Sequence, residues 1–200
     1  MALTDKLIAI ANAIRAKTGG TDQMTLDQMA TAISGISGGV EEPYIKETYD
    51  TNGNLTSVEL VGYSRIRDNA FYSCSNLTLT SLPSSVIAIG AYAFYNCSNL
   101  ALTSLPNTVT TIKNRAFYNC YNLVLTSLPS SVTTIGSYAF QYCTGLVSLT
   151  FKGVPNSVDS NVFSNCANLT TINVPWAEGA VANAPWGATN ATINYNYTEV

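Results

Sequence analysis

The sequence predicts a mostly β repeat solenoid, in which coils of one length stack on one another. The five cysteines of the chain follow one another at a constant spacing of 23 residues. Phenylalanines and leucines keep the same spacing, which chance does not produce. Self-similarity at a period of roughly 20–29 residues is typical of a leucine-rich solenoid, where each copy of the repeat is one coil. The cysteines are Cys74, Cys97, Cys120, Cys143 and Cys166.

Residues 1–35 are expected to form two short helices, followed by a Gly-rich hinge over residues 36–43. Apolar residues recur at helical spacing from Leu3 to Ile14, and a capping box that begins at Thr25 marks the second helix. A helical pair of this size buries little apolar surface alone. We expect it either to cap the solenoid or to attach and oligomerise the chain, and both alternatives stay open.

Residues 44–69 are expected to form a β-hairpin and a degenerate capping repeat. Two strand-like runs, 44–49 and 55–60, flank the pair Asn52-Gly53, which is typical of a hairpin turn. The segment that follows already keeps the repeat register. An incomplete coil of this kind shields the end of a solenoid.

The regular solenoid is expected over residues 70–170. Each coil carries an Ala-Phe-x-x-Cys phrase, interpreted as a tight helical turn, and an Ile that gives a further apolar ladder. A short strand is expected before the Pro of each Ser-Leu-Pro phrase, because Pro ends a strand but does not sit centrally in one. The fourth coil has its Pro later, at Pro155, and its strand is expected over 148–151. The Ser-Leu-Pro phrases lie at 81–83, 104–106 and 127–129.

Residues 171–200 break the repeat and are expected to form a β-rich C-terminal cap. The pattern predicts a strand, a Pro- and Gly-rich turn region with one helical turn, and a closing strand. Trp176 and Trp186 each follow a Pro in this region. We expect both rings to pack inside the cap rather than to bind a ligand.

The composition excludes several classes of function. Charged residues make up 10% of the chain, against roughly 25% in an average soluble domain. Nucleic-acid binding is not expected, because Lys and Arg supply most of that affinity by neutralising phosphates. Membrane insertion is not expected either, since no apolar run approaches the roughly 20 residues of a span. The first residues do not read as a secretion signal, so we expect folding inside the cell.

The cysteines are expected to form a ladder of buried thiols. An odd number at equivalent positions makes a poor disulfide framework, and a zinc site needs closely spaced Cys pairs or His, which this chain lacks. No cofactor is expected. A Ser in place of Cys120 is expected to destabilise the fold more than an Ala, because the hydroxyl would be buried without an assured partner.

Catalysis is not expected. Asp68 and Asp159 are the only acidic residues between Glu59 and Glu178, and the repeat places them in distant coils. A glycosidase needs two carboxyl groups facing one cleft, and a Ser nucleophile needs a base. The favoured class is therefore a non-enzymatic binding or structural protein.

Tyrosine recurs at two repeat positions in successive coils, with one Arg among them. Tyr presents a rigid, partly polar surface that recognition sites favour, and sugar rings stack on such ring faces. The alternative is that duplication copied these side chains and that the ladders only stabilise the stack. Both interpretations stay open. The candidate ligand or partner surface consists of Tyr72, Tyr92, Tyr95, Arg115, Tyr118, Tyr121, Tyr138 and Tyr142.

The repeat resembles that of the BspA-like (Treponema-type) leucine-rich repeat family. The shared pattern is C-x-x-L…LP-x-S-V-x-x-IG-x-x-AF-x-x-C, and it covers about residues 55–170. The resemblance implies a right-handed, mostly β solenoid of the kind found in bacterial surface proteins and adhesins. Members of that family usually carry a secretion signal, which the start of this chain does not resemble.

The two ends resemble tail-associated proteins of phages and prophages of Gram-positive bacteria. Residues 3–33 look like the start of such proteins, and 173–198 look like an end piece of them. The resemblance implies a virion tail protein, held in the host cytoplasm before assembly, that contacts a host-cell surface glycan or protein. Residues 1–35 would join it to other tail proteins or to copies of itself. The alternative is a leucine-rich repeat adhesin or interaction protein at the bacterial cell surface.

Overall fold

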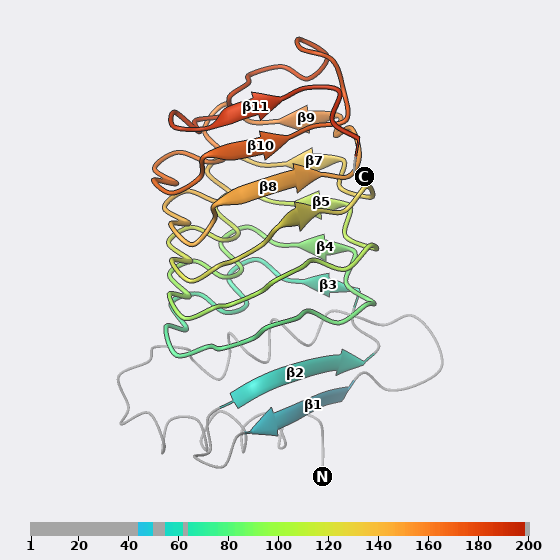
Figure 1. The fold of residues 1–200 in the computed structure, drawn as a ribbon. Helices are drawn as coiled ribbons and strands as arrows, with labels where there is room; N and C mark the ends of the chain where they lie inside the picture. Colours follow the sequence, from blue (N-terminus) through green and yellow to red (C-terminus); the bar gives the residue numbers. More distant parts are fainter. Residues whose placement is uncertain (1–43, 50–54, 62–63, 199–200) are drawn as a thin grey trace.

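A computed structural model describes residues 44–49, 55–61 and 64–198, and shows a solenoid of parallel strands (Figure 1). From residue 64 the chain winds through about six coils of roughly 23 residues, which confirms the predicted fold class. No helix occurs among the described residues, so none of them forms a helix that is long and apolar enough to cross a membrane. The helices expected over 1–35 and the hinge over 36–43 lie outside the described residues. The first five coils are 64–86, 87–109, 110–132, 133–155 and 156–178.

One wall of the solenoid is a five-stranded parallel sheet built on the isoleucine ladder. Its order is β3-β4-β5-β7-β9, one short strand from each of the five coils. The second residue of each strand is buried and lies level with its counterpart in the next coil, as Ile66 does with Ile89. The sequence identified this ladder but not its strands. They are β3 Arg65–Ile66, β4 Ala88–Ile89, β5 Thr111–Ile112, β7 Thr134–Ile135 and β9 Ser157–Val158.

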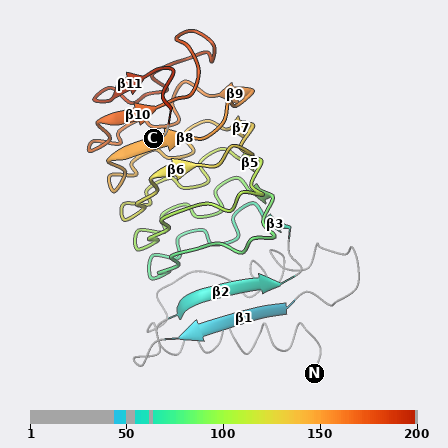
Figure 2. The same ribbon diagram turned by 45° about the vertical axis from the view of Figure 1, so that its right-hand side comes forward.

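The opposite wall is a four-stranded parallel sheet in the order β11-β10-β8-β6 (Figures 1 and 2). The strand expected at 148–151 is confirmed as β8, and β6 ends before Pro129 as predicted. No strand forms before Pro83 or Pro106, where one was expected. Coil-to-coil bonds are irregular there, and the bond from Thr103 N to Thr80 O is long at 3.4 Å. The strands are β6 Ser127–Leu128, β8 Ser148–Phe151, β10 Thr171–Asn173 and β11 Thr192–Asn194.

A β-hairpin lies at the N-terminal end of the stack (Figure 1). Its antiparallel strands, β1 Tyr44–Tyr49 and β2 Leu55–Val61, confirm the two strands expected here. The predicted turn at Asn52-Gly53 lies outside the described residues. Because β2 is antiparallel to β1 and the coil strands are parallel to one another, the hairpin is a separate element of the fold.

The Ala-Phe-x-x-Cys phrase forms a turn whose N–H groups alternate in direction, and not the helical turn expected. In the second coil, Phe94 N donates to Ala116 O of the next coil at 2.7 Å, whereas Tyr95 N donates within its own coil to Tyr92 O at 3.1 Å. A helix directs all its N–H groups along its own axis. Here a positive φ at residues such as Tyr92 (57°) directs alternate N–H groups to the neighbouring coil.

Stacked phenylalanine rings run through the core. Neighbouring rings lie nearly parallel, with centroids 5.1 to 5.6 Å apart. Each fully buried side chain of this size contributes roughly 1.5–3 kcal/mol to the free energy of unfolding. The ladder therefore stabilises the stack with few ion pairs. Its members are Phe71, Phe94, Phe117, Phe140 and Phe163.

The C-terminal cap closes the core with aromatic side chains, as predicted. Trp186 is completely buried and its Nε1 donates to Ala182 O at 2.8 Å. The Trp176 ring meets Phe151 edge-on with centroids 5.3 Å apart, and meets Trp186 at 6.2 Å. The cap has the two expected strands, β10 and β11, joined by turns without the helical turn that was expected. Both tryptophans are thus structural.

Four of the five cysteines are buried, which confirms the thiol ladder, and Cys74 at its N-terminal end is half-buried. All five lie among the described residues, where none forms a disulfide. Each buried thiol donates to the carbonyl oxygen of the core Phe in the preceding coil, at 2.9 to 3.1 Å. The ladder therefore contributes hydrogen bonds as well as apolar packing.

Candidate functional site

Three of the predicted tyrosines form one continuous stack on the surface. The rings of Tyr72 and Tyr95 have centroids 4.8 Å apart and an interplanar angle of 2°, and those of Tyr95 and Tyr118 are 4.6 Å apart at 6°. The coil period sets this spacing, because each side chain follows a Phe of the core ladder. The stack ends in the fourth coil, where Gln141 takes the equivalent place and the Tyr142 ring meets Tyr118 edge-on at 5.5 Å and 78°.

Arg115 lies between two tyrosine rings in the second column. Its guanidinium carbon is 5.6 Å from the Tyr92 ring centroid and 4.8 Å from that of Tyr138. The same guanidinium donates a hydrogen bond to the Tyr92 hydroxyl at 3.0 Å. A cation between two aromatic faces is attracted by both rings. Tyr92 also contacts Tyr95 at 5.7 Å, so the two columns are joined.

We call this connected surface the aromatic face. It contains every predicted site residue except Tyr121, which is 45% exposed and makes no ring contact with another aromatic side chain among the described residues. The prediction that these side chains share one surface rested on the repeat alone, and ring contacts now connect seven of the eight. The aromatic face is Tyr72, Tyr92, Tyr95, Arg115, Tyr118, Tyr138 and Tyr142.

Several residues of the aromatic face have a left-handed backbone. The φ angles of Tyr92, Arg115, Tyr138 and Tyr142 are 57°, 53°, 58° and 61°. This conformation is uncommon for residues other than Gly, Asn and Asp, and it costs on the order of 1–3 kcal/mol for each residue. Asn adopts this conformation at four other occurrences of these two repeat positions. These are Asn69, Asn96, Asn119 and Asn165.

The stacking decides which atoms meet a ligand. Because Tyr95 lies between two parallel rings, its faces are covered, and its edge and hydroxyl remain for contact. The expectation that sugar rings stack on the faces of this column is therefore wrong for Tyr95. Burial and the neighbouring hydroxyls of Tyr118 and Tyr72 raise the pKa of Tyr95. It stays a neutral hydrogen-bond donor and acceptor at physiological pH.

Two amide ladders follow the tyrosine stack in the sequence of the coils, one directly after Tyr95 and Tyr118 and one three residues further on, and sequence reasoning did not single them out. Asn119 donates to Asn96 Oδ1 at 2.8 Å, and Asn122 donates to Asn99 Oδ1 at 3.3 Å. The recurrence of Asn at one coil spacing was a signal that could have revealed them. The first ladder stops at Tyr142, and Asn119 Oδ1 is buried without a hydrogen-bond partner.

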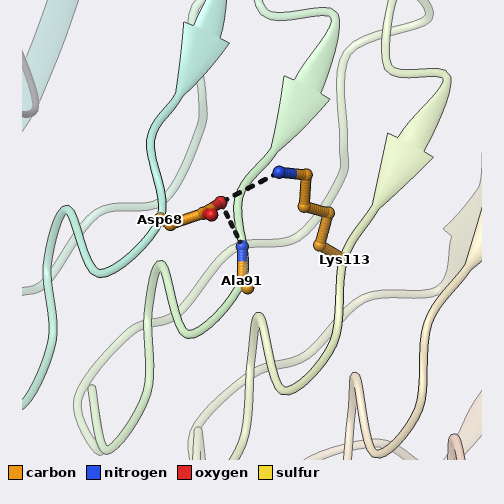
Figure 3. Close-up of polar contacts among 3 residues, drawn as sticks. All are labelled: Asp68, Ala91 and Lys113. Atoms are coloured by element: carbon orange, nitrogen blue, oxygen red, sulfur yellow. Dashed lines mark hydrogen bonds and ion pairs between the residues drawn. The ribbon is translucent and has the colours of Figure 1, made fainter.

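The carboxylates of the coils take part in structural contacts. Asp68 accepts hydrogen bonds from Ala91 N at 2.8 Å and from Lys113 Nζ at 3.1 Å, and so bridges three coils (Figure 3). Burial opposes ionisation of Asp68, but these two donors hold its pKa below the ordinary value. Asp159 follows β9, at the far edge of the sheet from β3. Among the described residues no cluster of His, Cys, Asp and Glu could hold a metal ion.

The parallel coils, the buried leucine and cysteine ladders and the surface side chains at a 23-residue period define a leucine-rich repeat solenoid. Residues 64–181 match the model of the BspA type leucine rich repeat region, in six copies. The chain therefore belongs to the BspA type leucine-rich repeat family.

Solved structures of bacterial leucine-rich repeat proteins are similar to this chain. A leucine-rich repeat protein of T. pallidum is 27% identical over 76% of this chain and 79% of its own, with a TM-score of 0.50. The pneumococcal vaccine antigen PcpA is 21% identical over 73% of this chain and 47% of its own, with a TM-score of 0.48. No curated protein matches the sequence. The resemblance of the two ends to phage tail proteins stays a prediction.

Proposed function

We propose that this chain is a non-enzymatic binding protein that uses the aromatic face to contact a glycan or protein at a bacterial cell surface. The observation that carries the proposal is the connected set of surface rings and one guanidinium across four successive coils. Its hydroxyls, ring edges and amide neighbours supply hydrogen bonds and apolar contact together. Recognition surfaces favour this combination.

The backbone supports a binding role over simple duplication. Asn69 shows that Asn fits the left-handed position of this column, yet the next three coils hold Tyr92, Arg115 and Tyr138 there. Asn tolerates that conformation better than Tyr or Arg does. A ladder maintained for stability alone would favour Asn at this position. Strained residues of this kind cluster at functional sites.

The partner class follows from the family and from the surface chemistry. The resemblance of the repeats implies surface proteins and adhesins, and the chain belongs to that family. A surface of hydroxyls and amides with few charges suits a polyhydroxyl ligand. We therefore place a cell-surface glycan ahead of a protein as the partner.

A place in a phage or prophage tail is the narrower form of this proposal. It rests on the two end segments, of which residues 1–43 lie outside the described residues. Neighbouring genes separate the alternatives, because tail and lysis genes accompany a tail protein, whereas secretion and anchoring genes accompany an adhesin. Removal of residues 1–35 tests the attachment role: the truncated chain is expected to stay folded and to become monomeric.

Saturable binding of labelled protein to a panel of Gram-positive whole cells tests the proposal. The Tyr72/Tyr95/Tyr118→Ala variant is expected to lose this binding and to keep its fold. Tyr121→Ala is the matched control, since it removes an exposed Tyr outside the aromatic face. Equal binding by native protein and triple variant, or no binding to any strain, contradicts the proposal.

A further inference from the structure

The coils that carry the aromatic face are cationic, although the whole chain has a net charge of −3. Residues 64–155, the four coils that carry the aromatic face, contain five Lys or Arg residues and a single acidic residue, Asp68. Arg65 lies in β3 and Arg67 directly follows it, in the first coil. Lys113 and Arg115 follow β5 in the third coil, at nearby repeat positions. The fourth coil adds one more cation, and the second coil has none. The cations are Arg65, Arg67, Lys113, Arg115 and Lys152.

Lys113 and Arg115 differ in the groups that contact their charged ends. Lys113 is paired with Asp68 at 3.1 Å, and both side chains are about half exposed, at 51% and 52%. Arg115 is contacted by two rings and one hydroxyl, and by no acidic side chain among the described residues. A guanidinium carries five N–H donors in a planar fork, and the Tyr92 hydroxyl accepts one of them. The rings hold the fork in place while its charge stays uncompensated.

We propose that Arg115 binds the anionic groups of an acidic polysaccharide, a carboxylate or a phosphodiester, which lies along the aromatic face. This inference rests on the proposed function and names its ligand class. Planar guanidinium groups match carboxylate and phosphate oxygens with two parallel hydrogen bonds. The stacked tyrosine hydroxyls run along the solenoid from coil to coil, and they hydrogen-bond the sugar hydroxyls next to the anion.

The surface favours a polysaccharide over an acidic peptide. A peptide that adds to a fold through its backbone needs unpaired N–H and C=O groups along an edge. Here the backbone N–H groups of the turn are used between coils or within a coil, as those of Phe94 and Tyr95 show. Side-chain hydroxyls and the Asn99–Asn122 amide ladder supply the remaining polar groups. These groups suit the many hydroxyls of a sugar chain.

The test compares two variants of the full chain that each remove one positive charge. Arg115→Asn keeps the backbone conformation accessible, because Asn69 adopts a φ of 62° at the same repeat position. Lys113→Gln is the matched control, two residues away. The probes are polygalacturonate, polyglycerol phosphate, neutral dextran and poly-L-glutamate. Binding is measured at low and high salt, and thermal unfolding verifies the fold of each variant.

Native protein is expected to bind polygalacturonate or polyglycerol phosphate and not dextran, and the better of the two identifies the anion. Arg115→Asn is expected to weaken this binding at least about tenfold, as loss of a charge-assisted hydrogen bond predicts, and Lys113→Gln by less than about twofold. Equal loss in both variants, equal binding of dextran, equal binding of poly-L-glutamate, or no binding of any probe overturns the inference. If Arg115→Asn still binds cells and the triple Tyr variant does not, the inference about Arg115 is overturned and the proposed function stands. If native protein binds no cells, the proposed function itself is overturned.

Discussion

The thiol of Cys120 donates a hydrogen bond to the carbonyl oxygen of Phe94, 3.1 Å away in the preceding coil. The same oxygen accepts the backbone N–H of Cys97 at 3.1 Å. One carbonyl therefore connects its own turn to the side chain of the next coil. A Ser at position 120 would find this acceptor in place, which the sequence did not reveal.

We predict that Cys120→Ser is no more destabilising than Cys120→Ala, the reverse of the order that the sequence suggested. The Ser hydroxyl reaches toward Phe94 O, whereas Ala loses the bond and leaves a small cavity. The expected cost of Cys120→Ala is about 1–2 kcal/mol in the free energy of unfolding. Denaturant unfolding measures both free energies, provided that the two variants show the same dependence of the free energy of unfolding on denaturant concentration. A Ser variant clearly less stable than the Ala variant would show that the size of sulfur matters more than the hydrogen bond.

We predict that the protein loses stability in alkaline solution through its thiols. Burial raises the pKa of Cys166 to about 12, and burial with neighbouring thiols raises the pKa of Cys97 and Cys143 well above the ordinary value. Unfolded thiols ionise near pH 8.5, so the folded state holds more protons above that pH. The contribution of the thiols to stability is then constant below about pH 8.5 and falls toward pH 12, by up to about 1.4 kcal/mol per pH unit for each thiol.

Unfolding free energies measured from pH 7 to pH 10 check this dependence. Cys166→Ala removes one titrating thiol. Above pH 8.5, the unfolding free energy of this variant is expected to fall less steeply with pH than that of the native protein, by the contribution of that one thiol. A slope that is flat across this range, or unchanged in the variant, would show that the buried thiols do not couple to unfolding.

The repeat period made the architecture predictable from the sequence. Equal spacing sets the register of every coil, and apolar residues at fixed positions must face the core. The stacked coils, the strand at 148–151, the buried thiols and the packing of Trp186 all followed from this reasoning. Burial of apolar surface depends mainly on residue type and position, which a sequence shows directly.

The details of the site could not be predicted in the same way. A spacing of 23 residues brings Tyr72 and Tyr95 together, but the ring orientation that covers their faces depends on side-chain rotamers. The left-handed backbone at Tyr92 contradicts the ordinary preference of Tyr, so local propensity indicated a helical turn. The ion pair between Asp68 and Lys113 joins the first coil to the third, because the long flexible Lys side chain reaches past the coil between them.

We predict that Tyr142→Asn stabilises the fold. Tyr142 has a φ of 61°, and it interrupts an amide ladder that leaves Asn119 Oδ1 buried without a partner. Asn tolerates the left-handed conformation, and its amide would donate to that oxygen in the way that Asn119 donates to Asn96. The expected gain is about 1 kcal/mol in the free energy of unfolding. Tyr121→Asn is the control and is expected to give no gain, while an equal change in both variants would contradict the role of the ladder.

We predict that Gly90→Ala destabilises the stack strongly. A Cβ at this position would lie 2.4 Å from both Arg67 C and Asp68 N, which are backbone atoms of the preceding coil. The first coil would have to move, at an expected cost of about 1–3 kcal/mol. Lys113→Ala is the matched control at the equivalent position of the next coil, because it keeps an existing Cβ and loses only an exposed ion pair worth about 0–1 kcal/mol. Thermal midpoints measure both effects, and a Gly90→Ala midpoint equal to that of Lys113→Ala would show that the coils separate at little cost.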